Sequence, residues 1–75
     1  MGAYKLENIR HDFEVATKGR WAGDTETLLE ISYRLIRDWP DNQAKDMAIS
    51  HLLQAAGMIS IIMEESGEKT IEKQG

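Results

Sequence analysis

The segment from residue 41 to residue 65 carries more apolar side chains than one face of a helix can hold. Its first apolar set follows helical spacing and consists of Ala44, Met47, Ala48, Leu52, Ala55, Ile59, Ile62 and Met63. A second set, Leu53, Ala56, Met58 and Ile61, widens the stripe beyond one face. A helix that is apolar on more than one side has to be covered from more than one side.

The rest of the chain offers little material to cover such a helix. With 75 residues the chain forms one domain at most, and a single core of this size is marginal. There is no cysteine, so disulfides and thiolate metal sites are excluded. His11 and His51 lie far apart and show no metal-binding spacing. Small domains without such staples commonly self-associate, and we therefore predict a homo-oligomer, a dimer or higher.

Two shorter helices are expected before the long one. The spacing of Leu6, Ile9, Phe13 and Ala16 predicts a helix over residues 4–16. Asp24 has the properties of an N-cap for the second helix. That helix carries Leu28, Ile31, Leu35 and Trp39 on one stripe, with Leu29, Ser32 and Ile36 beside it.

Pro40 ends the second helix and opens the third, over residues 41–65, either at its first position or before an Asp41 N-cap. No alternating β-branched run occurs. The predicted fold class is all-α: a three-helix protomer, in which a helical hairpin ends in a long C-terminal helix. One domain is expected over residues 1–66, followed by a polar tail over residues 67–75 that we expect to be frayed or disordered.

Charge and hydropathy exclude several classes of partner. The formal net charge is −4, with 13 acidic and 9 basic side chains, and no basic face is present to bind a DNA or RNA polymer. No apolar run approaches the length of a membrane span, and we expect no signal peptide at the start of the chain. We expect a soluble, cytoplasmic protein, and the absence of cysteine fits a reducing cytosol.

The loop over residues 18–23 is the most informative local feature. It contains Lys18, Arg20 and Trp21 between two glycines, directly before a helix N-terminus. Arginine and lysine bind phosphate and an aromatic ring stacks on a base, so this combination suits a nucleotide-like ligand. The alternative is a basic surface loop in which Trp21 fastens the first helix to the second. Arg10 lies on the polar face of the first helix, toward the loop, and is a further candidate.

No catalytic constellation accompanies this loop. His11 and Asp12 have no serine or cysteine nucleophile at a recognisable spacing. The carboxylates of Asp12 and Glu14, and of the pair at 64–65, are not joined by metal-spaced histidines. We expect no enzyme activity, no metal and no cofactor. The small residues at 55–57 sit mid-helix, where Gly57 costs helix stability, and indicate either a subunit interface or close packing against the second helix.

The third helix resembles the C-terminal half of the phage anti-CBASS cyclic-oligonucleotide sponge family. That family shows a proline, then a helix with Leu-Ala-Leu-Thr-x-Leu and, three residues on, an alanine. Here Pro40 is followed by Met47-Ala48-Ile49-Ser50 in the same place, with Leu52 and Ala55 in register. The likeness covers roughly a third of the chain. A Trp-x-Asn step of the family is replaced by residues 58–60, and residues 10–13 are the nearest counterpart of an N-terminal aromatic segment.

The resemblance implies a compact helical oligomer, possibly a hexamer in the family's manner, that sequesters a cyclic di- or trinucleotide without cleaving it. The ligand site would lie between subunits and would use N-terminal aromatic and basic residues. This implication adds Phe13 to the candidates and places Ser50 at the family's threonine. The candidate ligand-binding residues are then Arg10, Phe13, Lys18, Arg20, Trp21 and Ser50. The alternative is a small helical protein that inhibits a host protein by direct binding.

Overall fold

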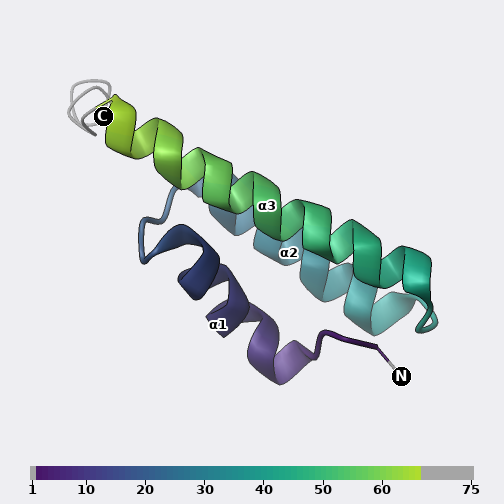
Figure 1. Ribbon diagram of the computed structural model, residues 1–75. Coiled ribbons are helices and arrows are strands. Elements are labelled where there is room, and N and C mark those ends of the chain that lie inside the picture. The colour runs from purple at the N-terminus through teal and green to yellow at the C-terminus, as the bar shows by residue number, and fades with distance from the viewer. Residues whose placement is uncertain (1, 67–75) are drawn as a thin grey trace.

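The computed structural model describes residues 2–66 and consists of three helices (Figure 1). Helix α1 spans Leu6–Thr17, α2 spans Gly23–Asp38 and α3 spans Gln43–Glu65. Figure 1 shows α2 and α3 side by side as an antiparallel hairpin, with α1 lying along it and the N-terminal segment near the α2–α3 turn. The all-helical prediction is confirmed for the described residues, while the tail predicted over residues 67–75 lies outside them.

The loop between α1 and α2 is shaped by two residues with left-handed backbone conformation. Lys18 has φ 55° and Gly19 has φ 80°. Their amides donate hydrogen bonds to the carbonyls of Val15 (3.2 Å) and Glu14 (3.1 Å), which closes the end of α1. Left-handed conformation is strained for a residue with a Cβ and unstrained for glycine, so Gly19 suits this turn.

All three helix starts differ from the predicted ones by one or two residues, and α1 begins at Leu6 instead of residue 4. Helix α2 begins at Gly23 after Ala22, and Thr25 Oγ1 accepts a hydrogen bond of 3.3 Å from the Ala22 amide. Asp24 is therefore in the first turn and is not the cap. Its negative charge there interacts favourably with the helix dipole. Helix α3 is capped by Asn42, whose side-chain oxygen accepts from the Lys45 amide at 2.7 Å.

The core is small and lies where the three helices meet. Its fully buried apolar residues are Ile9, Phe13, Leu29, Ile49 and Ala56. On α2 the buried row is the one beside the predicted stripe, because Leu29 and Ser32 are buried while Trp39 is 64% exposed. On α3 the buried residues are Lys45, Ile49, Ala56 and Ser60, so the first predicted apolar set contributes to this core only through the partly buried Leu52.

Hydroxyl side chains occupy some of the core positions, which larger apolar side chains usually fill. Thr17 Oγ1 donates to the carbonyl of Phe13 (2.9 Å), Ser32 Oγ to that of Leu28 (3.0 Å) and Ser60 Oγ to that of Gly57 (2.7 Å). Each hydroxyl is satisfied within its own helix, so its burial leaves no polar group without a partner. Small side chains at these positions let the helices approach closely.

The turn between α2 and α3 is fixed by a buried lysine. The Lys45 ammonium donates to the carbonyl of Trp39 (2.8 Å) and lies within 3.5 Å of that of Ile36, at the end of α2. It also pairs with Asp41 Oδ1 at 2.7 Å. Asp41 Oδ2 accepts from the Gly2 amide at 3.0 Å, so the N-terminal segment is tied to the same turn.

The exposed side of α3 is strongly apolar. Met47, Met58, Ile61 and Ile62 are exposed large apolar side chains of this helix. By length and composition α3 is also the one helix among residues 2–66 that could cross a membrane, with a mean hydropathy of 1.4 over its best window, of which 17% is buried. The expectation that no apolar segment approaches such a length was therefore wrong. A helix that is covered by other protein can have the same length and composition.

Candidate functional site

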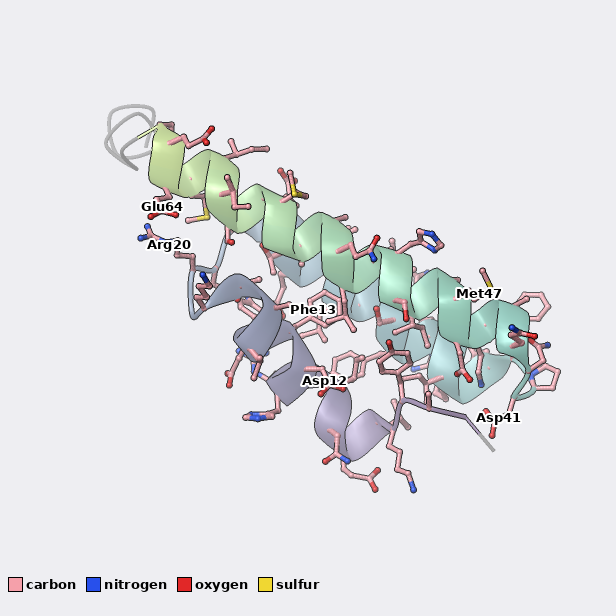
Figure 2. All side chains as sticks on the ribbon, viewed as in Figure 1. Asp12, Phe13, Arg20, Asp41, Met47 and Glu64 are labelled. Carbon is pink, nitrogen blue, oxygen red and sulfur yellow. The ribbon has the colours of Figure 1, made fainter. Side chains whose placement is uncertain are left out.

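A groove of about 410 Å³ lies between the end of α1, the α1–α2 loop and the C-terminal half of α3. The loop side contributes Lys18 and Arg20, and the α3 side contributes apolar and polar residues. The complete lining is Ala16, Thr17, Lys18, Arg20, Gln54, Gly57, Met58, Ser60, Ile61 and Glu64. Figure 2 shows the labelled side chains of Arg20 and Glu64 at the same end of the molecule, far from Asp41 and Met47 at the other end.

Gly57 gives this groove its floor. A Cβ atom at position 57 would lie 3.3 Å from the carbonyl oxygen of Ala16, which is tighter than ordinary van der Waals contact. The glycine therefore lets the end of α1 lie directly against α3. Of the two interpretations of the small residues at 55–57, close packing within the protomer holds for Gly57, but the neighbour is α1 and not α2. Ala55 is exposed, while Ala56 is in the core.

Trp21 does not line the groove. Its indole Nε1 donates to Glu26 Oε1 at 2.5 Å, and the guanidinium of Arg10 lies 4.9 Å from the ring centroid. Arg10 also approaches Glu14 (3.7 Å) and Glu26 (4.0 Å). These contacts join α1, the loop and α2, as the structural interpretation of the loop expected. They also cover one face of the indole ring with a cation.

The two candidates taken from the resemblance lie elsewhere. Phe13 is fully buried, and Figure 2 shows its ring pointing between the helices, so it offers no surface to a ligand in this protomer. Ser50 Oγ and the Tyr4 hydroxyl share a hydrogen bond of 2.5 Å near the start of α3. Of the six candidates, the structure thus brings Lys18 and Arg20 together in the groove and pairs Arg10 with Trp21.

A second, more open hollow of about 310 Å³ lies near the N-terminal segment. Its lining is Gly2, Tyr4, Lys5, Leu6, Glu7, Ile36 and Asp41. The pKa of Asp41 is lowered, first by the hydrogen bond from Lys45 and then by that from the Gly2 amide. Its carboxylate is already engaged by the fold, which makes this hollow a weaker candidate for an anionic ligand than the groove.

The described part of the chain contains no cluster of side chains suited to metal binding or to acid–base chemistry. No group of three or more His, Asp or Glu side chains is close enough to hold a metal ion within residues 2–66. Apart from Asp41, the shifted groups are Arg37 and Asp38 on the surface of α2. Their side-chain hydrogen bond raises the pKa of Arg37 and lowers that of Asp38.

Sequence reasoning missed the α3 side of the groove. Met58 and Ile61 were assigned only to a widened apolar stripe, and Glu64 only to a carboxylate pair without histidines. The mid-helix glycine was the one local signal, because it marked a close approach without identifying the neighbour. Comparison of the chain with family models, with curated proteins and with solved structures gives no match.

Proposed function

We propose that this protein is a non-enzymatic, homo-oligomeric binder that sequesters a cyclic nucleotide, as a phage anti-defence sponge in the host cytoplasm. The observation that carries the proposal is the groove, in which Lys18 and Arg20 lie opposite the apolar side chains of Met58 and Ile61. Its volume of about 410 Å³ falls within the usual range of small-molecule sites.

The two sides of the groove suit the two parts of a cyclic nucleotide. Charge-assisted hydrogen bonds from lysine and arginine are the common way of holding phosphate oxygens. The exposed apolar surface of Met58 and Ile61 can cover the face of a base. Removing a base face from water costs less free energy than removing a charged phosphate does. The resemblance of the third helix to the sponge family favours the same class of ligand, a cyclic di- or trinucleotide.

Self-association is part of this proposal because of the apolar side chains that α3 leaves exposed. Ala48, Leu52, Ala55, Ile59 and Ile62 are spaced alternately by four and three residues; Ala48, Ala55 and Ile62 are exposed, whereas Leu52 and Ile59 are half-buried. That spacing places them in one row, as in helices that pack against another helix at a small angle. Ile62 in this row is 61% exposed and neighbouring Met58 is 58% exposed. A second copy of the chain would cover the row, and the family's oligomers favour a dimer or a higher assembly such as a hexamer.

Sequestration requires tight binding and slow release and no chemical step. Cleavage of a phosphodiester needs an activated nucleophile or base and stabilisation of the developing charge. Among the residues that the structure describes, the groove lining supplies two cations, one carboxylate (Glu64) and no histidine. We therefore propose that a bound nucleotide leaves unchanged.

Titration calorimetry with a panel of cyclic di- and trinucleotides tests the proposal. At least one ligand should bind the parent protein, and Lys18→Ala should weaken it in a salt-sensitive way. Arg34→Ala is the matched control, because Arg34 is an exposed cation of α2 that does not line the groove. Chromatography after overnight incubation with Mg²⁺ should return intact ligand. Failure of every ligand to bind, or linear product beyond one equivalent per site, would reject the sponge.

The exposed apolar side chains also favour a second candidate, direct inhibition of a host protein. Trp39, Met47, Met58 and Ile62 are each more than half exposed, and large aromatic and methionine side chains are frequent at protein interfaces. A protein inhibitor would ignore cyclic nucleotides, so the calorimetric panel separates the two candidates.

A further inference from the structure

We infer that Glu64 makes the groove selective for a guanine-containing nucleotide, an inference that rests on the proposed function. Within residues 2–66, Glu64 is the one carboxylate that lines the groove, and it shares that lining with the two cations of the loop. A ligand in the groove would therefore contact both kinds of charge. The cations suit its phosphates, and the carboxylate suits a part of the ligand that donates hydrogen bonds.

The position of Glu64 on α3 fits this division of the ligand. Gly57, Ile61 and Glu64 are spaced by four and three residues and therefore share one face of the helix. Each turn of a helix advances by roughly 5.4 Å, so Glu64 lies about one turn beyond the apolar surface of Ile61. A base whose face covers Met58 and Ile61 would have its hydrogen-bonding edge at the level of Glu64.

The chemistry of a carboxylate selects among the bases. An ionised carboxylate only accepts hydrogen bonds, through two oxygens side by side. Guanine presents two adjacent donors on its Watson–Crick edge, the N1–H group and the 2-amino group, and matches both oxygens. Adenine presents its amino group beside the acceptor N1, which a carboxylate repels. Cytosine likewise places an acceptor beside its amino group.

Arg20 at the same groove does not remove this selectivity. Figure 2 shows the labelled Arg20 and Glu64 side chains at the same end of the molecule, and both line the groove. A carboxylate oxygen has more than one acceptor direction, so Glu64 can face a cation and a base edge together.

Calorimetry with cyclic di-GMP and cyclic di-AMP, at matched salt, tests the inference on the full chain. The parent should prefer the guanine ligand by about tenfold or more, as one two-point contact to a base gives. Glu64→Gln should lose that preference or turn toward adenine, because an amide pairs one acceptor with one donor. Glu65→Gln is the matched control, since Glu65 is the next residue, is exposed and does not line the groove.

The outcomes separate this inference from the proposed function. Binding of both ligands with equal affinity by the parent, or an unchanged preference in Glu64→Gln, would overturn the role of Glu64 and leave the binder standing. If Glu65→Gln also lost the preference for guanine, the role of Glu64 would be overturned, because the preference would then depend on the net charge near the groove and not on one carboxylate. If neither these two ligands nor any other cyclic nucleotide binds the parent, the proposed function fails and the selectivity fails with it.

Discussion

The Lys45 ammonium and the Asp41 carboxylate lie 2.7 Å apart and form an ion pair with one buried and one exposed member. The side chain of Lys45 is 5% exposed, whereas that of Asp41 is 50% exposed. Through Lys45 the pair closes the end of α2, and through Asp41 it holds the Gly2 amide. One contact therefore joins the N-terminal segment, the α2–α3 turn and the start of α3.

Asp41→Asn should lower stability in a pH-dependent way. The folded-state pKa of Asp41 is lowered, so its contribution is present above the unfolded pKa of about 3.9 and is lost as the pH falls through the folded value. Urea unfolding of parent and variant should differ most between neutral pH and about pH 5; the difference should shrink as the pH falls below about 4 and should vanish only below the folded pKa. Glu30→Gln is the control, because Glu30 is an exposed carboxylate in the middle of α2. A difference that stays constant down to acid pH would contradict this account.

Gly57→Leu should destabilise the protomer itself. The added side chain would start 3.3 Å from the Ala16 carbonyl and force α1 away from α3, an overpacking that typically costs about 1–3 kcal/mol. Thermal unfolding at several protein concentrations measures the loss, which should not depend on concentration. Ala55→Leu is the matched change at an exposed position two residues earlier, and any effect of it should vary with concentration. A Gly57→Leu protein as stable as the parent would mean that α1 does not pack here.

Ile62→Glu should shift the protein toward the monomer. A charge in the exposed row of α3 has to be desolvated when a second copy covers that row, which opposes association. Sedimentation at micromolar concentration should show at least a dimer for the parent and a smaller species for the variant. Val15→Glu is the control, because Val15 is equally exposed at 64% but lies on α1. A parent protein that is a stable monomer would refute self-association.

Arg10 and Trp21 should stabilise the fold jointly. A guanidinium 4.9 Å from the indole centroid contributes roughly 0.5–1 kcal/mol at exposed sites. A double-mutant cycle with Arg10→Ala and Trp21→Ala, measured by urea unfolding, should give a coupling energy of that size. The pair Arg34→Ala and Trp21→Ala is the uncoupled control. If Trp21→Ala weakens nucleotide binding and leaves stability unchanged, the ring belongs to the ligand site instead.

The helices could be predicted from periodicity and punctuation, but the buried face of α3 could not. Hydropathy ranks Lys45 and Ser60 as surface residues, and their burial depends on carbonyl acceptors at the end of α2 and within α3. Much of the apolar surface that hydropathy selects then stays exposed, as at Met47, Met58 and Ile62. Sequence alone therefore identified an excess of apolar surface without showing which side of the helix the protomer itself covers.

The groove was half predictable for a similar reason. Lys18 and Arg20 were identified because the loop is local, with its cations and glycines adjacent in the chain. Met58, Ile61 and Glu64 join them only because α1 folds back onto α3, and no spacing within α3 reveals that contact. The separation of Trp21 from the cations beside it also depends on tertiary structure, since Arg10 and Glu26 hold the ring away from the groove lining.

The buried hydroxyls carry a calorimetric consequence. Exposure of apolar surface raises the heat capacity on unfolding and exposure of polar surface lowers it. Within residues 2–66 the buried set contains as many polar or charged side chains, Thr17, Thr25, Ser32, Lys45 and Ser60, as apolar ones. A lone protomer should then melt with a small heat-capacity increment and a flat dependence of stability on temperature. If a second copy covers the apolar row of α3, unfolding exposes that row as well and the heat-capacity increment becomes larger. The curvature of the free energy of unfolding against temperature should therefore grow with protein concentration.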